Sequence, residues 1–159
     1  MRSKTRSASN SASKRRDKPH VYFVDRSLGG KVVPEALRRL GLNVEVHDDH
    51  FAQNETDRAW LAAVARKGWI ILSKDSAIRR RLVERQEIIN AGASAFFLIR
   101  GNLTGLQMAE AFNKAIPAIR KILDRTSGPV LGVIRSDGSI GLLDGNLKKQ
   151  PQSKKPRRP

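Results

Sequence analysis

The sequence contains no cysteine among its 159 residues. This absence excludes a disulfide scaffold, a thiolate zinc site and a cysteine nucleophile. Long hydrophobic runs are also absent, and a stretch such as Trp69-Ile70-Ile71-Leu72 is far shorter than the roughly 20 apolar residues of a transmembrane helix. Residues 1–19 are basic but lack the apolar core of a secretory signal peptide. We therefore expect a cytoplasmic protein that does not contact a membrane.

Acidic residues are scarce relative to basic ones, since 15 Asp and Glu oppose 31 Lys and Arg and leave a formal net charge of +16. Residues 1–19 carry a net charge of +6, and residues 145–159 carry another +6. Both segments are rich in polar residues and proline and cannot bury enough apolar surface to offset chain entropy. We expect two disordered basic tails, which serve either solubility alone or attraction to a polyanion such as RNA.

Between the tails, short β-rich runs alternate with helical segments. The sequence predicts strands at 21–24, 42–47, 69–72 and 95–99, with helices at about 34–40, 57–67 and 76–90 between them. Ile78, Leu82 and Ile89 are expected to face inward from the helix at 76–90. Such alternation is typical of an α/β three-layer sandwich, in which helices cover both faces of a mostly parallel central sheet.

The C-terminal part of the folded region is predicted to be a long helix followed by a β-hairpin. Thr104 and Gln107 have the spacing of a capping box, and Pro117 is expected to kink the helix. Apolar residues recur at helical spacing along it: Leu106, Ala109, Phe112, Ile116, Ile119 and Leu123. The Asp137-Gly138 pair is a hairpin signal between two apolar runs. We therefore expect a core domain at 20–126 and a C-terminal hairpin extension at 127–144.

Acidic side chains follow each of the first three predicted strands. Asp25 comes directly after the first strand, Asp48 and Asp49 follow the second, and Asp75 follows the third. Asp57 begins the helix after the second strand. In parallel sheets, ligands bind outside the carboxyl ends of the strands, so we expect several of these carboxylates in one region. Clustered carboxylates with few histidines suit Mg²⁺ or Mn²⁺.

Each of these residues also has a structural explanation. Asp57 favours its helix N-terminus electrostatically, and Asp75 has the position of a helix cap. Asp25 is harder to explain in this way, because an acid that ends an apolar strand is costly unless it is paired or solvated. His47 and His50 lack an evident third ligand for zinc. From the residues alone, the metal site and the structural explanations both stay open.

Signals for phosphate binding are weaker. Arg79, Arg80 and Arg81 form either the solvated side of a helix or a group that reaches phosphate at the mouth of the acidic site. The chain has neither a P-loop nor a GxGxxG motif, and Gly29-Gly30-Lys31 is too short to indicate a nucleotide site.

In these motifs the chain resembles PIN-like domains, and especially the compact branch of VapC-type toxins, over about residues 20–124. Three segments carry the resemblance: Val24-Asp25-Arg26-Ser27 after the first strand, Thr56-Asp57-Arg58-Ala59-Trp60-Leu61 at a helix start, and Leu72-Ser73-Lys74-Asp75 after the third strand. The resemblance implies that Asp25, Asp57 and Asp75 hold Mg²⁺ or Mn²⁺ for the hydrolysis of RNA. It also implies that Ser27, Ser73 and Lys74 support this site and that Arg79, Arg80 and Arg81 bind the substrate.

The chain also departs from the family pattern. PIN-like domains commonly have four acids, whereas Arg100-Gly101-Asn102 stands where the fourth is expected. Asp48 or Asp49 is a candidate substitute. The number of metal ions therefore stays open.

By family analogy, the expected function is that of a metal-dependent endoribonuclease toxin with an RNA substrate and a cognate antitoxin protein as partners. The oligomeric state, a homodimer included, is open. One alternative is a catalytically inactive PIN-like RNA-binding module. Another is a phospho-accepting receiver domain. Such a domain usually has paired acids at the end of its first strand and a lysine after its last one, whereas here Arg26 follows Asp25 and Arg100 stands at the late position, so this alternative is disfavoured.

Overall fold

The computed structural model describes residues 20–99 and 102–143, so the two predicted tails, together with Arg100 and Gly101, lie outside the described residues. The strands are β1 (Val21–Val24), β2 (Asn43–Val46), β3 (Ile70–Ser73), β4 (Ala95–Leu98), β5 (Leu131–Ile134) and β6 (Ile140–Leu142). The helices are α2 (Val32–Arg39), α3 (Asp57–Arg66), α4 (Ser76–Arg80), α5 (Leu82–Asn90) and α6 (Gly105–Arg125). Two short 3₁₀ turns, η1 (Arg26–Leu28) and η2 (His47–Asp49), follow the first two strands.

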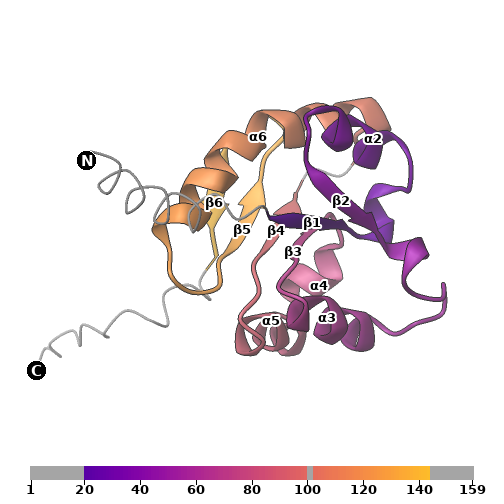
Figure 1. Cartoon of the computed structure of the whole chain (residues 1–159), viewed down its shortest axis with the longest axis vertical. Helices are drawn as coiled ribbons and strands as arrows, with labels where there is room; N and C mark the ends of the chain where they lie inside the picture. Colours follow the sequence, from indigo (N-terminus) through magenta and orange to yellow (C-terminus); the bar gives the residue numbers. More distant parts are fainter. Residues whose placement is uncertain (1–19, 100–101, 144–159) are drawn as a thin grey trace, which may run out of the picture.

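The strands form one six-stranded sheet in the order β2-β1-β3-β4-β5-β6 (Figure 1). Every pair from β2 to β5 is parallel, and β6 pairs antiparallel with β5. The predicted hairpin is confirmed, and its first strand continues the parallel sheet through β4. Since a parallel connection needs a long crossover, a helical segment lies between each successive pair of strands up to β5, which confirms the α/β prediction.

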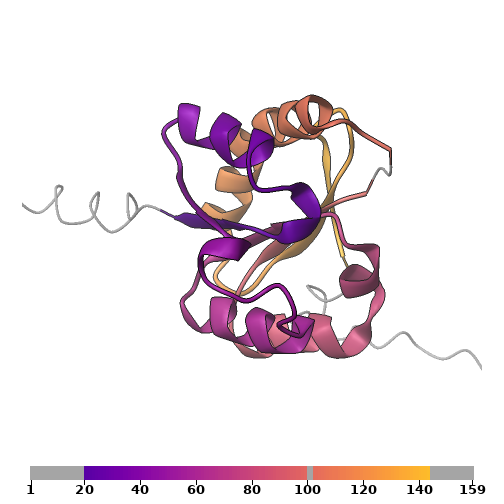
Figure 2. The ribbon, with the colours of Figure 1, turned by 90° about the vertical axis from the view of Figure 1, so that its right-hand side faces the viewer.

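Helices cover both faces of the sheet, with α2 and α6 on one face and α3, α4 and α5 on the other (Figures 1 and 2). Successive strand residues point to opposite faces. Tyr22 and Val24 of β1 therefore join the core under α2 and α6, whereas Phe23 joins the core under α3. Because both faces are covered, the central strands are apolar on both sides.

The described part of the chain has no helix that is long and apolar enough to cross a membrane.

The single helix predicted at 76–90 is wrong, because Arg81 has an extended backbone (φ −74°, ψ 123°) that separates α4 from α5. Ile78 and Ile88 are both completely buried in the core on this face. In one continuous helix these residues would point about 80° apart, since successive residues turn by about 100°. The break lets both pack into the same core, and Ile89 is only partly buried.

The apolar face of α6 is rotated relative to the predicted one. Ala109, Phe112, Ile116 and Ile119 are buried as predicted, but Leu106 is 74% exposed. Leu106 points about 120° away from Phe112 at 100° per residue. The helix runs through Pro117 without ending there.

The tip of the β5–β6 hairpin packs closely on α6, which predicts that Gly138 is sensitive to substitution. Gly138 has φ +88°, and a Cβ at this position would lie 2.5 Å from the Cβ of Lys114. Gly68 has φ +74° but open space around it. We expect Gly68→Ala to lower the free energy of unfolding by about 1 kcal/mol through backbone strain alone. Gly138→Ala should cost about 2 kcal/mol or more, because overpacking is added. Urea unfolding measures both, and equal losses would contradict the close packing.

Candidate functional site

The candidate site lies where β1 and β3 end side by side. In the strand order β2-β1-β3, β2 pairs with one side of β1 and β3 pairs with the other side. The connections after β1 and after β2 therefore run in opposite directions across the sheet, which makes the carboxyl ends of β1 and β3 a topological switch point. Asp25 follows β1 directly, and Ser73 is the last residue of β3. The backbone N–H of Asp25 donates to the Leu72 carbonyl at 2.9 Å, so the pairing of the two strands continues into the site.

The carboxylate of Asp25 is buried and accepts hydrogen bonds from two serines. Asp25 is 4% exposed. The Ser27 hydroxyl donates to its Oδ2 at 2.7 Å, and the Ser73 hydroxyl donates to the same oxygen at 2.8 Å. The two serines come from η1 and β3, so residues far apart in the sequence meet at one carboxylate oxygen.

Backbone groups hold the two hydroxyls in turn. The N–H of Lys74 donates to Ser27 Oγ at 3.0 Å, and the N–H of Asp75 donates to Ser73 Oγ at 3.0 Å. Each serine therefore accepts from the backbone while it donates to Asp25. Such chained hydrogen bonds polarise one another and fix the direction of each hydroxyl. Ser27 and Ser73 thus contact Asp25 directly, Lys74 takes part through its backbone, and their supporting role in the site stays a prediction.

The environment of Asp25 disfavours its charged form. Burial raises the pKa of the Asp25 carboxyl above its ordinary value, and the negative charge of Asp75 raises it further. The hydrogen bonds from Ser27 and Ser73 act in the opposite direction and lower this pKa, but the net shift is upward. A cation beside Asp25 and Asp75 would relieve both unfavourable effects.

Asp75 caps a helix and also lies close enough to Asp25 for its charge to act on that carboxyl. Its Oδ1 accepts from the N–H groups of Ala77 and Ile78 at 2.8 and 3.3 Å, so it caps α4. It is half-buried, and its charge acts on Asp25. A cap uses one carboxylate oxygen, so the structural position leaves the second oxygen for a further ligand.

Asp57 is held apart from this pair. The Trp60 indole N–H donates to Asp57 Oδ1 at 3.2 Å, and the Arg81 guanidinium lies 3.9 Å from Asp57 Oδ2. Asp48 and Asp49 are exposed on η2. Within residues 20–99 and 102–143, no three acidic or histidine residues are grouped closely enough to hold a metal ion together. The structure thus brings together Asp25 and Asp75 but not Asp57.

This donor set fits magnesium or manganese. Mg²⁺ commonly binds through one or two carboxylates and keeps several waters. Asp25 and Asp75 supply two carboxylates, whose oxygens are hard donors. A bound cation would offset the repulsion between the two negative charges.

Of the three arginines in the predicted substrate-binding run, Arg81 lies beside an acidic residue of the site. It also contacts Glu84 Oε2 at 3.3 Å and therefore bridges Glu84 and Asp57. Arg79 is half-buried and Arg80 is exposed. Sequence reasoning missed Glu84, which is only 8% exposed and has its Oε1 unpartnered among the described residues. The sequence offered no signal for Glu84, because an acidic residue within a predicted helix is expected on its solvent-exposed side.

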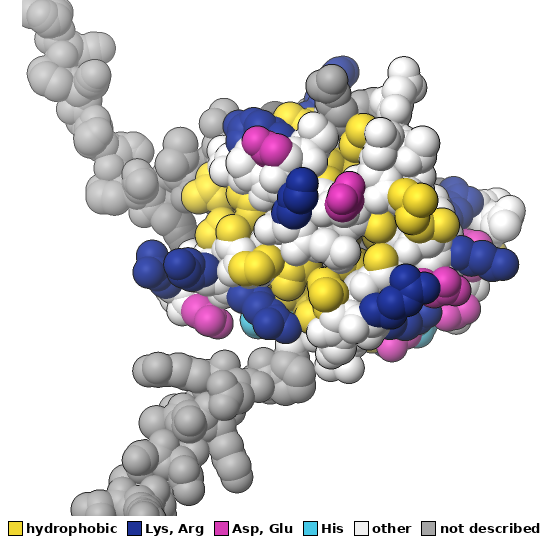
Figure 3. All heavy atoms as spheres, turned by 90° about the horizontal axis from the view of Figure 1, so that it is seen from above, with side chains coloured by type: hydrophobic (Ala, Val, Ile, Leu, Met, Phe, Trp, Pro, Cys, Tyr) yellow, Lys and Arg dark blue, Asp and Glu magenta, His cyan; other side chains and the backbone are white. Residues whose placement is uncertain are grey.

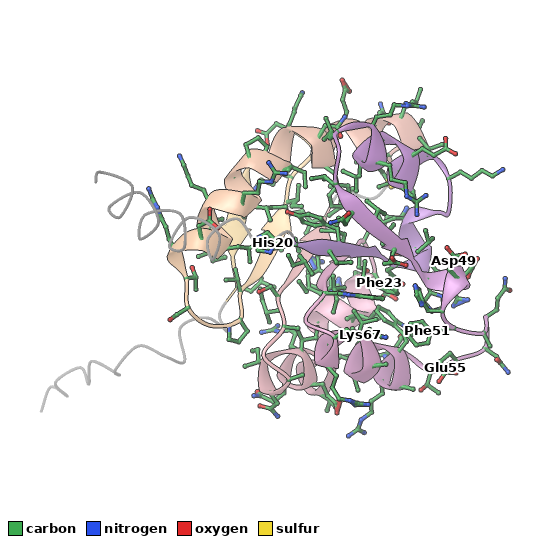
Figure 4. The ribbon with its side chains drawn as sticks, viewed as in Figure 1. His20, Phe23, Asp49, Phe51, Glu55 and Lys67 are labelled. Carbon is green, nitrogen blue, oxygen red and sulfur yellow. The ribbon has the colours of Figure 1, made fainter. Side chains whose placement is uncertain are left out.

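An aromatic cluster supports the Asp57 side of the site. Phe23 packs against Trp60 with ring centroids 5.3 Å apart, and Phe51 contacts Phe23 at 6.0 Å (Figure 4). His47 is buried against Phe51 and Trp60. His47 is therefore a core residue of this cluster. Because Trp60 is fixed in this cluster, its indole N–H fixes Asp57.

The raised pKa of Asp25 predicts a pH dependence in the metal-free protein. A carboxyl whose pKa is raised in the folded state holds its proton more tightly there than in the unfolded chain. Below the unfolded pKa of about 4 the group is protonated in both states, and its full contribution to the free energy of unfolding is present. That contribution is lost as the pH rises through the higher folded pKa. In EDTA, Asp25→Asn should therefore gain stability relative to the wild type between about pH 4 and pH 7. Urea unfolding at several pH values tests this, and a difference that is independent of pH would contradict it.

Comparisons with known proteins agree with this geometry. Residues 20–100 match the family model described as a PIN like domain. The chain is 34% identical over 131 residues to a protein of Mycobacterium tuberculosis (strain ATCC 25618 / H37Rv) named "Putative ribonuclease VapC45", and the match covers 80% of this chain and 94% of the relative. No solved structure gives a significant match. The family match includes β1, β3 and the acidic pair between them, and the chain belongs to the PIN-like domain family, in its VapC-type branch.

Proposed function

We propose that this protein is a metal-dependent endoribonuclease and the toxin of a two-component toxin–antitoxin module. The observation that carries the proposal is the buried carboxylate of Asp25, oriented by two serines beside Asp75 at the β1–β3 edge. The mycobacterial relative, which is named as a ribonuclease, supports RNA as the substrate.

In this proposal Asp25 and Asp75 bind Mg²⁺ or Mn²⁺, and Asp57 joins them when RNA and metal are present. A divalent cation supplies Lewis acidity, which makes water a better nucleophile and offsets negative charge at phosphorus. Ser27 and Ser73 hold Asp25 Oδ2, so the carboxylate keeps its direction without metal. Water provides the oxygen that forms the new bond to phosphorus, the bond between phosphorus and the departing ribose oxygen breaks, and the proton that the water loses is replaced by one taken up at that ribose oxygen.

Basic side chains near the acids bind the RNA backbone in this proposal. Arg79, Arg80 and Arg81 follow the Asp75 cap within α4 and at its end, and Lys74 immediately precedes it. A planar guanidinium binds phosphate oxygens in pairs. The excess of basic residues over the whole chain, +16, adds a general attraction to RNA.

The partners and site of action follow from this function. RNA in the cytoplasm is the substrate, and an antitoxin protein that covers the acidic site is the regulatory partner, by analogy with the family. Association into a homodimer is compatible with both.

A second function, RNA binding without cleavage, is favoured by one observation. Asp57 is engaged by Trp60 and Arg81 and is not grouped with Asp25 and Asp75. If Asp57 stays there in the presence of metal and RNA, the site has two carboxylates only.

Metal binding is expected to depend most on the assembled pair. Asp25→Asn and Asp75→Asn should each weaken Mn²⁺ binding by at least about tenfold, because each removes one of two charges that attract the ion. Asp57→Asn should have a smaller effect in the absence of RNA. Isothermal titration calorimetry measures all three, and Asp49→Asn is the matched control, because Asp49 is exposed on η2. Unaltered Mn²⁺ affinity in Asp25→Asn and Asp75→Asn would refute the metal site.

Cleavage of single-stranded RNA is expected to require divalent metal and Asp25. Asp25→Asn should reduce the cleavage rate by about a thousandfold, which corresponds to about 4 kcal/mol of transition-state stabilisation. Gel analysis of RNA incubated with Mn²⁺, or with EDTA, gives the rates, and Asp49→Asn should cleave like the wild type.

Expression in a host without the antitoxin then separates cutting from binding. Growth arrest by the wild type but not by Asp25→Asn agrees with a toxic nuclease. Arrest by both proteins alike would show that toxicity comes from RNA binding.

A further inference from the structure

A surface cavity of about 420 Å³, wide open to solvent, adjoins the acidic site on the side of α2 and α6. It is lined by the η1 turn, by the Gly29-Gly30-Lys31 segment and by the first turns of α2 and α6. This volume lies within the range of about 300–1,000 Å³ that is typical of small-ligand sites. The glycine–lysine segment, which is too short to indicate a nucleotide site by sequence, thus forms one wall of a cavity.

The cavity shares Ser27 with the candidate catalytic site. Ser27 lines it, and the same residue donates its hydroxyl to Asp25 at 2.7 Å. A ligand that contacts Ser27 in the cavity would therefore be separated only by this residue from the Asp25 carboxylate, which we assign to metal binding. A strand of RNA whose phosphate is held at Asp25 places its neighbouring nucleotide within reach of this cavity.

The interior of the cavity is apolar. Leu28 and Met108 form buried parts of the lining, and Val32, which is 44% exposed, forms part of the mouth. Figure 3 shows the molecule from the side of α2 and α6, where exposed hydrophobic side chains lie among Lys, Arg, Asp and Glu side chains. Apolar and polarisable groups such as Met pack well against the flat faces of ring systems.

The charged residues of the lining are all basic. Arg26 and Lys31 are exposed there, and no acidic residue is among the described residues that line the cavity. Arg26 donates to the Gln53 carbonyl at 2.8 Å, which holds its guanidinium in place. Lys31 has no ion pair among the described residues. An apolar interior with a basic rim is complementary to a nucleotide, which has an apolar base face and an anionic phosphate.

We propose that this cavity binds the nucleobase next to the cleaved phosphate and so determines which RNA sequence is cut. The proposal rests on the proposed function for its substrate. RNA is favoured over a protein segment because the charged residues of the described lining are basic and because Ser27 links the cavity to Asp25. Leu28, Val32 and Met108 contact the base, and Arg26 and Lys31 contact the flanking phosphates.

Gly30→Leu is the sharpest test, because it adds a large side chain to the lining without backbone strain. A Cβ at Gly30 meets no atom within 4 Å, and φ at Gly30 is not in the left-handed region, unlike φ at Gly29. Ala118→Leu is the matched control, since it adds the same side chain at an exposed position of α6 outside the cavity lining. Val32→Ala enlarges the mouth, and Leu40→Ala, at the other end of α2, is its control. Urea unfolding establishes that each variant is folded.

Two measurements are made on the full chain. Fluorescence anisotropy in the Asp25→Asn background gives the affinity for four single-stranded hexamers, one each of A, C, G and U. Sequencing of the fragments made by proteins with intact Asp25 and Mn²⁺ gives the nucleotides beside the cut. We expect Gly30→Leu to weaken binding of the preferred hexamer by about tenfold and to flatten the preference among bases. Val32→Ala should change the preference, and both controls should behave like the wild type.

Three outcomes would overturn the proposal. Unchanged affinity and cut sites in Gly30→Leu would show that no base enters the cavity. An equal loss for all four hexamers without a change in cut sites would show contacts with the backbone alone. Loss of neutralisation by the antitoxin with unchanged RNA binding would assign the cavity to that protein. Absence of cleavage by the wild type refutes the proposed nuclease instead, and the hexamer affinities still decide the base site.

Discussion

The burial of one carboxylate, that of Asp25, is the constraint on which the rest of the site depends. A buried carboxylate is unfavourable unless hydrogen bonds or cations compensate for the lost hydration. Ser27 and Ser73 supply hydrogen bonds, and they do so because β1 and β3 are adjacent and parallel. The η1 turn supplies Ser27, and the Lys74-Asp75 segment before α4 donates one backbone N–H to each serine.

The two faces of the sheet make different contributions to this edge. The face under α2 and α6 supports the η1 turn and the apolar cavity beside it. The opposite face contains the aromatic cluster, in which Trp60 holds Asp57, while Arg81 connects Asp57 to Glu84. Acidic groups thus lie at the strand ends, and basic groups lie around them, as a site for a polyanion bound through a cation requires.

Much of the fold could be predicted because it depends on local patterns. The alternation of strands and helices and the Thr104–Gln107 capping box match the structure. The helix at 76–90 was predicted wrongly, because no glycine or proline marks the extended residue Arg81. Packing of Ile78 and Ile88 into one core, together with the contacts of Arg81 to Asp57 and Glu84, accompanies that break.

The sequence by itself determined the order of strands and helices, the positions of the caps and the placement of Asp25 and Asp75 after strands. These features rest on periodicity and on hydrogen bonds between residues a few positions apart. Only the tertiary structure decided that Ser73 meets Asp25 across 48 residues of sequence, that Asp57 stays with Trp60, and that Gly30 lines a cavity with Met108. These depend on strand order and on distances between packed segments, which local patterns do not encode.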